Sequence, residues 1–190
     1  MKKLVTCAEM KDLDSTTIRE IGVPSEVLME RAALKVVEET EKYLQKDERI
    51  LVVCGSGNNG GDGIAVARLF HLKGIRVEFY MVGNKDKMTR ETALQYKIAS
   101  GYRVPEVNNP QWSEYTTIVD AVFGVGLTRP IEGHYADIIH EMNSARAKKI
   151  AVDIPSGVNG DTGLEIGIAF SADMTVTFAY RKRGPCFHTG

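Results

Sequence analysis

The stretch Ile50-Leu51-Val52-Val53-Cys54-Gly55-Ser56-Gly57-Asn58-Asn59-Gly60-Gly61-Asp62-Gly63 decides the fold of this 190-residue chain. Its first five residues form a continuous apolar run, which is typical of a strand covered on both faces, as in a parallel sheet. A glycine-rich turn follows at once, and from about Gly61 the apolar spacing predicts a helix that continues to Gly74. A further strand is predicted at 77–82. The stretch is therefore expected to open a βαβ unit.

The same alternation continues on both sides of this unit. Downstream, the patterns predict helices near 89–100 and 134–143 and strands at 118–122, 150–154 and 175–178. Upstream, Thr6 and Glu9 have the spacing of a capping box and start a helix that stops at 22–24, and the apolar stripe from Leu28 to Leu44 marks a second, longer helix. Two helices are thus expected before any strand. The whole pattern predicts an open, mostly parallel sheet with helices on both faces.

Composition and charge limit the class of protein. A chain of this length can bury a sizeable core, so one domain covering 1–190 is expected without metal or disulfides. Lys and Arg number 24 against 25 Asp and Glu, a net charge of -1 that disfavours nucleic acid and anionic lipid as partners. No window approaches the ~20 apolar residues of a membrane helix. The three cysteines (Cys7, Cys54 and Cys186) show no CxxC spacing, which favours reduced thiols in the cytoplasm.

Three segments that follow predicted strands can carry chemistry, because sites in open α/β sheets gather beyond the carboxyl ends of the strands. The first, 55–63, contains a GxGxxG pattern, but the next strand ends without a carboxylate for a ribose, which disfavours conventional NAD binding. We expect its backbone N–H groups to hold an anion, with side-chain contacts from Asn58, Asn59 and Asp62. The alternative is a tight turn without a ligand.

The other two segments are 120–130 and 153–157. Gly124 and Gly126 permit close backbone approach and Arg129 can pair with a phosphate, although a flexible loop with a solvated arginine is an equal alternative. Asp120 and Asp153 each end an apolar strand, where an aspartate can merely cap a turn. Together with Ser156 they favour a crevice with hard oxygen ligands and a general acid/base.

Other candidate groups point to no site. The four histidines (His71, His134, His140 and His188) lack metal-ligand spacing, and no serine lies in a GxSxG elbow. The apolar stripe of the second helix is expected to form core or a dimer face.

In combination, these segments resemble the YjeF N-terminal domain family, the NAD(P)H-hydrate epimerases. The resemblance covers nearly the whole chain and rests on these motifs: Met10 with Leu13-Asp14, Gly22-Val23-Pro24, Leu28-Met29-Glu30, Asn58-Asn59-Gly60-Gly61-Asp62, Asp120 with Phe123-Gly124, Gly126-Leu127, Arg129-Pro130, Asp153-Ile154-Pro155-Ser156-Gly157 and Asp161-Thr162-Gly163. It implies a Rossmann-like three-layer α/β/α sandwich, commonly homodimeric, that interconverts the R and S forms of hydrated NADH and NADPH (NADHX and NADPHX). A dehydratase, fused or separate, would act as functional partner and repair only the S form.

The resemblance also implies site residues. Substrate-binding positions fall on Asn58, Asn59, Gly60, Gly61, Asp62, Gly124, Val125, Gly126, Leu127, Thr128, Arg129, Pro130 and Asp153, and a potassium site falls on Asn59, Asp120 and Ser156. Val125 departs from the family, which often has a small hydroxyl residue there. The family's domain usually continues past Gly190 through one more strand, so the sequence is expected to be a fragment of a longer or bifunctional protein, the alternative being a sheet that lacks an edge strand.

Asp153 is the expected catalytic group. The hydrate carries a hydroxyl on the ring carbon next to nitrogen, so inversion needs this C–O bond to break and to re-form from the other face. We hypothesise that Asp153 acts as general acid/base on that hydroxyl or its water. The alternatives are a non-catalytic nucleotide-binding scaffold and, less favoured, a nicotinamide dehydrogenase.

Overall fold

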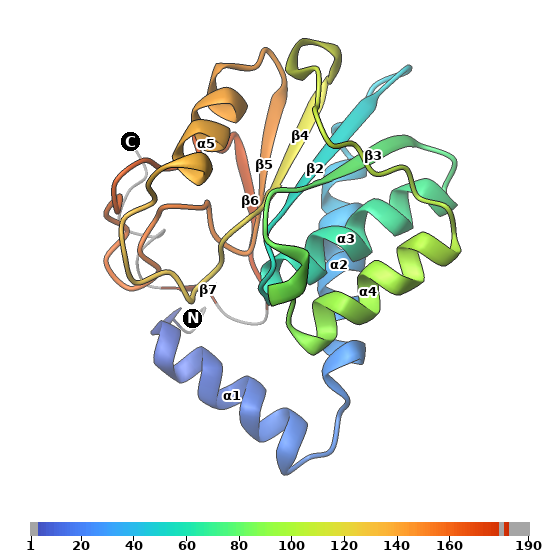
Figure 1. Ribbon diagram of the computed structural model, residues 1–190. Coiled ribbons are helices and arrows are strands. Elements are labelled where there is room, and N and C mark those ends of the chain that lie inside the picture. The colour runs from blue at the N-terminus through green and yellow to red at the C-terminus, as the bar shows by residue number, and fades with distance from the viewer. Residues whose placement is uncertain (1–3, 179–180, 183–190) are drawn as a thin grey trace.

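Five strands form one parallel sheet in the computed structural model, which describes residues 4–178 and 181–182 (Figure 1). Their order across the sheet is β3-β2-β4-β5-β6, and every neighbouring pair is parallel. The strands are β2 (Arg49–Cys54), β3 (Arg76–Met81), β4 (Thr117–Ala121), β5 (Lys148–Val152) and β6 (Met174–Val176). This arrangement confirms the predicted α/β fold with a parallel, Rossmann-like sheet. Cys186 and His188 lie outside the described residues.

Helices cover both faces of the sheet. The helices are α1 (Cys7–Arg19), α2 (Ser25–Glu41), α3 (Asn58–Leu72), α4 (Arg90–Gly101) and α5 (His134–Ser144), with short 3-10 turns η1 (Lys85–Lys87) and η2 (Trp112–Glu114). In Figure 1, α2, α3 and α4 lie on one side of the sheet and α5 on the other, while α1 stands apart below the sheet. The helices predicted from the repeat pattern are therefore confirmed.

Burial along β2 explains why its sequence is apolar throughout. Ile50, Val52 and Cys54 pack in the core beneath α2, α3 and α4, whereas Leu51 and Val53 pack in the core beneath α5. All five side chains are fully buried, and each large apolar one contributes roughly 1.5–3 kcal/mol by leaving water. A strand between two helical layers has no face left for polar side chains.

The structure corrects two predictions about where elements begin. A two-residue strand, β1 (Leu4–Val5), precedes the helices and pairs in parallel with β7 (Arg181–Lys182), so helices are not the first elements. A strand this short carries too little sequence pattern to be recognised. The third helix begins at Asn58 rather than near Gly61, because glycines with poor helix propensity occupy its first turns.

The remaining boundaries agree to within a few residues. Thr6 and Glu9 form the predicted capping box, with the Thr6 hydroxyl accepting from the Glu9 N–H and the Glu9 carboxylate accepting from the Thr6 N–H. The apolar stripe of α2 packs in the core, which was one of the two roles expected for it, the other being a dimer face. Leu44 lies beyond the end of the helix. Within the described residues no helix is long and apolar enough to span a bilayer.

Candidate functional site

The turn between β2 and α3 is shaped by close backbone contacts. The Gly55 N–H donates to the Ala121 carbonyl at 3.0 Å, which ties the turn to the end of β4. A Cβ on Gly60 would collide with the Gly55 carbonyl, so only glycine fits there. Gly57 is the N-cap of α3 and has no side chain to satisfy the first N–H groups of the helix. The first turn of α3 therefore presents backbone donors and the positive end of the helix dipole.

Asp120 and Ser156 form a buried hydrogen-bonded pair between β4 and the loop after β5. The Asp120 carboxylate accepts the Ser156 hydroxyl at 2.6 Å, the Ser156 N–H at 2.7 Å and the Val122 N–H at 3.1 Å. The Ser156 hydroxyl in turn accepts the Phe123 N–H at 2.8 Å. Burial raises the pKa of the Asp120 carboxyl to about 6, against the lowering effect of the hydrogen bonds from Ser156. The pair locks the two loops that follow β4 and β5 together.

Asp120 has an unusual charge environment. Its side chain is fully buried, and across residues 4–178 no lysine, arginine or histidine forms an ion pair with it. A buried carboxylate without a cation is costly. The site is therefore suited to a small cation with oxygen ligands.

Asn59 is brought against the same loops. Its side chain packs on Gly124, where an added Cβ would lie 3.3 Å from the Asn59 Cγ, and Gly124 follows Phe123 in the chain. The buried amide nitrogen of Asn59 makes no hydrogen bond among the described residues. Asn59 therefore contacts the loop after β4, in which the neighbouring Phe123 N–H donates to the Ser156 hydroxyl of the buried pair.

Asp153 follows β5 in a left-handed backbone conformation, with φ of 67°. Such a conformation costs roughly 1–3 kcal/mol in a residue other than glycine, and it is concentrated at functional sites. The Asp153 carboxylate accepts the Thr177 hydroxyl at 3.2 Å, just after β6. The hydroxyl of Thr177 thus holds the Asp153 carboxylate beside the end of β6.

A cleft of about 830 Å³ opens at this edge of the sheet. It is bounded by the start of α3, the strand-end loops and the two N-terminal helices, and it is lined by Met10, Asp14, Ile18, Ser25, Leu28, Met29, Arg31, Ala32, Leu34, Lys35, Glu38, Asn58, Asp62, Glu91, Val125, Asp153, Thr177 and Phe178. From α1 and α2 the lining takes both apolar side chains and charged ones, including Arg31 and Lys35, and from the sheet edge it takes Asn58, Asp62 and Asp153. A cleft of this size can take a nucleotide-sized ligand.

The α1 wall of the cleft is held at its N-terminal end. The Asp161 carboxylate, in the loop after β5, accepts the Cys7 N–H at 2.7 Å, and Gly160 leaves room for the Cys7 sulfur. A carboxylate at a helix N-terminus also complements the helix dipole. The loop that carries Asp153 and Ser156 therefore also positions α1.

The cleft gathers residues from all three predicted segments. Asn58, Asp62, Val125 and Asp153 line it, and Asn59 and Gly124 pack on each other beside it. Val125, the departure from the family pattern, presents an apolar side chain to the cleft. Gly60 and Gly61 are buried in the first turns of α3, where they allow close packing.

The far part of the 120–130 segment is more exposed. Gly126, Thr128, Arg129 and Pro130 are exposed, and Leu127 packs partly on the core beneath α5. As far as the structure describes the chain, none of these five residues lines the cleft.

Sequence analysis missed Thr177 and Phe178 at the cleft. Both follow β6 as observed, which ends at Val176, but the sequence pattern predicted a strand that continued to 178, so looking beyond the end of each predicted strand did not point to them. Ser25 and Glu91, which hydrogen bond to each other at 3.0 Å, come from the starts of α2 and α4 and carried no sequence signal.

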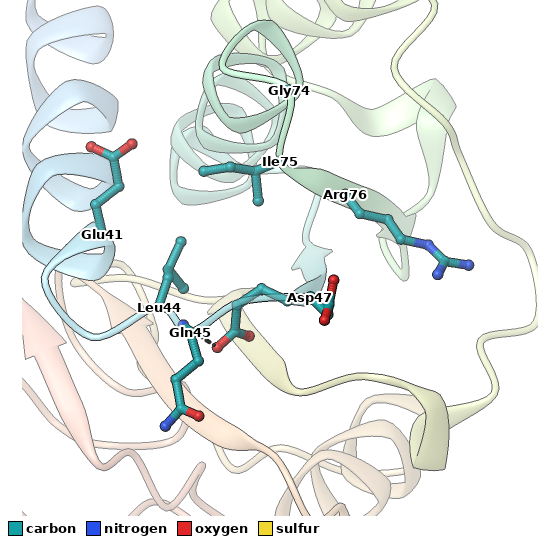
Figure 2. A pocket seen from close by; sticks show the side chains of 8 residues that line it. Glu41, Leu44, Gln45, Asp47, Gly74, Ile75 and Arg76 are labelled. Carbon is teal, nitrogen blue, oxygen red and sulfur yellow. Dashed lines mark hydrogen bonds between the residues drawn. The ribbon is translucent and has the colours of Figure 1, made fainter.

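A second hollow of about 550 Å³ lies away from these residues (Figure 2). In Figure 2, Leu44 and Ile75 point toward each other and Arg76 extends away from Leu44, and the rest of the lining is Glu41, Gln45, Asp47, Glu48 and Gly74. The lining residues flank the starts of β2 and β3, at the opposite edge of the sheet from Asp153. It contains none of the predicted site residues.

Metal-ligand clusters and cysteine thiols are two further kinds of candidate site. In the described ranges, no three His, Cys, Asp or Glu side chains are grouped so that they could hold a metal ion. Cys54 is a buried free thiol, and burial raises its pKa.

Comparison with known proteins identifies the family. The model of the family described as "YjeF-related protein N-terminus" matches residues 25–184. The chain belongs to this family. Within it, the NAD(P)H-hydrate epimerase of Limosilactobacillus fermentum is 44% identical over 184 residues, covering 96% of this chain and 88% of the relative. The NAD(P)H-hydrate epimerase of Oenococcus oeni is 47% identical over 190 residues, covering 98% and 90%.

A solved structure supports the fold of this YjeF-related domain. The crystal structure of yeast ynu0, YNL200c, superposes with a TM-score of 0.86, covering 97% of this chain and 84% of the yeast chain. The two sequences are 22% identical, so the comparison establishes the shared architecture.

Proposed function

We propose that this protein is an NAD(P)H-hydrate epimerase, an isomerase that interconverts the R and S epimers of hydrated NADH and NADPH. Relatives with that name are 44% to 47% identical over nearly the whole chain. The observation that carries the proposal for the site is Asp153, a carboxylate held in a left-handed backbone conformation where it lines the cleft. Positioned carboxylates of this kind serve as general acid/base groups.

In the proposed reaction, Asp153 donates a proton to the departing hydroxyl and later accepts one from the incoming water. The nicotinamide ring nitrogen donates its lone pair as the C–O bond breaks, and the Asp153 carboxyl gives its proton to the hydroxyl, which leaves as water. Water then adds to the opposite face of the ring carbon, and the Asp153 carboxylate takes the proton that it releases. Atoms and charge balance over the cycle, and the configuration at one carbon is inverted.

We propose that the substrate is held by the first turn of α3 and the loop after β4. Backbone N–H groups at 58–62 would bind the phosphates, with Asn58, Asn59 and Asp62 adding side-chain contacts. The segment 124–130 would close over the nucleotide, with Arg129 pairing a phosphate. Since Arg129 is exposed and outside the cleft lining, this last role requires the loop to move toward the substrate.

The catalytic role is tested with Asp153→Asn. Exchange between R and S forms of purified hydrate is followed by chromatography or NMR, with Asp12→Asn, an exposed carboxylate on α1, as the matched control. We expect turnover to fall by about 10²–10⁴-fold in Asp153→Asn while nucleotide binding is kept. Full turnover in this variant would remove Asp153 from the mechanism. Absence of exchange with the unmodified protein would favour the non-catalytic scaffold.

We propose a potassium ion at Asn59, Asp120 and Ser156. The support is the chemistry of the donors, which are amide, carboxylate and hydroxyl oxygens, and the buried Asp120 carboxylate that lacks a cationic partner in the described part of the chain. A bound potassium ion supplies a positive charge at that carboxylate. Asp120 and Ser156 themselves hold the loops after β4 and β5 in register.

This proposal is tested by thermal unfolding in potassium chloride and in tetramethylammonium chloride at equal ionic strength. We expect a higher midpoint in potassium, by an amount that increases with concentration, and no such difference in Asp120→Asn. Equal midpoints for the unmodified protein in the two salts would remove the ion from the site.

Partners and compartment are proposed from the family resemblance. We expect a cytoplasmic homodimer that works with an NAD(P)H-hydrate dehydratase, fused or separate. Light scattering on the purified protein tests the first expectation, and a monomer at micromolar concentration would contradict it.

A further inference from the structure

The start of α4 is anchored to the glycine turn that precedes α3. Thr89 is the N-cap of α4, and its backbone N–H donates to the Ser56 carbonyl at 3.0 Å. Three residues later, the Thr92 hydroxyl donates to the Gly57 carbonyl at 2.8 Å. Thr92 is fully buried. Two successive carbonyls of the turn are therefore held by one helix start.

The hydrogen-bond directions around these two threonines are determined by counting protons. The hydroxyl oxygens of Thr89 and Thr92 lie 2.8 Å apart, and the Thr92 N–H donates to the Thr89 hydroxyl oxygen at 3.3 Å. Since the single Thr92 hydroxyl proton goes to the Gly57 carbonyl, the Thr89 hydroxyl must be the donor between the two side chains. Every proton in the pair then has an acceptor, which fixes both rotamers.

The Gly57 carbonyl is a sensitive point for the site. It also accepts the Gly61 N–H at 3.2 Å, the first helical hydrogen bond of α3. A helix start without a side-chain cap depends on such outside contacts for its orientation. The Thr92 hydroxyl also lies against Gly61, at 2.9 Å from the place where a Cβ would be. The Thr92 side chain therefore contacts both ends of the first turn, which carries Asn58 and Asn59.

We propose that Thr92 is a positioning residue for the epimerisation. Its buried hydroxyl orients the first turn of α3, and through that turn it sets where Asn58, Asn59 and Asp62 meet the substrate. The inference rests on the proposed function. Thr92 itself does not line the cleft, so it acts only through the Gly57 carbonyl.

The test compares three variants of the full chain. Thr92→Val keeps the shape and removes the hydroxyl, Thr92→Ser keeps the hydroxyl, and Thr40→Val is the matched control because Thr40 is buried in α2 with a hydroxyl that has no hydrogen-bond partner among the described residues. We expect kcat for R/S exchange to fall by about 10- to 100-fold in Thr92→Val. Thr92→Ser should restore it, and Thr40→Val should leave it unchanged.

A merely structural role predicts a different pattern. In that case Thr92→Val would lower the unfolding midpoint while its folded fraction kept the original kcat and KM, and this result would overturn the proposal. If Thr92→Val does not fold, Thr92→Ala with a smaller side chain carries the same comparison.

Amide hydrogen exchange separates failure of this inference from failure of the proposed function. We expect the Gly61 N–H to exchange about three- to tenfold faster in Thr92→Val than in the unmodified protein, because its acceptor is less firmly held. Unchanged Gly61 exchange overturns the inference whatever the activity. Faster Gly61 exchange in a protein that never interconverts the two hydrates would support the anchor and overturn the proposed function.

Discussion

Replacing Ser156 with alanine tests how strongly the loops after β4 and β5 depend on one hydroxyl. The Ser156 hydroxyl donates to the fully buried Asp120 carboxylate at 2.6 Å and accepts the Phe123 N–H at 2.8 Å. A hydrogen bond to a charged group contributes about 1.5–3 kcal/mol, and a buried donor left without an acceptor costs about 1–3 kcal/mol. Because Phe123 is partly buried and water can reach some of the freed groups, we expect the free energy of unfolding to fall by about 2–5 kcal/mol.

The assay is urea unfolding followed by circular dichroism at constant potassium concentration. The urea midpoint should fall while the slope stays constant, and in a thermal scan the midpoint should fall by about 4–20 °C for a chain of this size. Ser113→Ala, at an exposed serine in η2, should change stability by less than about 0.5 kcal/mol. A loss below about 1 kcal/mol in Ser156→Ala would refute the view that this pair holds the two loops together.

Two further substitutions test the glycine turn and the first helix. Gly60→Ala places a Cβ against the Gly55 carbonyl and should destabilise the protein by about 1–3 kcal/mol in urea unfolding. Gly101→Ala places a Cβ where no atom lies within 4 Å, so it should stabilise α4 by up to about 1 kcal/mol. Equal effects of the two substitutions would contradict the close contact at Gly60. Thr6→Ala removes the capping box and should lower the free energy of unfolding by about 1 kcal/mol, with faster amide hydrogen exchange in α1. Because α1 forms a wall of the cleft, KM should also rise. Unaltered amide exchange in α1 would contradict the role of this cap.

Much of the fold could be predicted because buried parallel strands leave a simple pattern. A run such as 50–54, apolar at every position, has no explanation on the surface of a protein, and its neighbours 118–122 and 150–154 are apolar except for Asp120 and Asp153. The chemistry-bearing residues could be found by the same argument, since each lies near the end of one of these runs or directly after it. Asn58, Asp62 and Asp153 were predicted together for this reason, and the cleft brings them together.

Pairings across the fold could not be predicted, because they depend on register and loop geometry. The Asp120 and Ser156 side chains are 36 residues apart, and their contact requires β4 and β5 to be neighbours in one alignment. The same holds for Thr92 and Gly57. The start of α3 was misplaced because Gly60 and Gly61 disfavour helix locally, whereas tertiary packing requires a residue without a Cβ at these positions.

The hydrogen bond from the Cys7 N–H to the Asp161 carboxylate joins groups 154 residues apart. The pairing of β1 with β7 spans a similar distance along the chain. On a ribosome, therefore, the first helix to emerge is among the last to find its docking partners, since Asp161 is synthesised only after α1 to α5 and β5. Until then Met10, the apolar residue of α1 that the fold buries, stays open to water and to chaperones. Assembly of the cleft is in this way postponed until most of the polypeptide has been made.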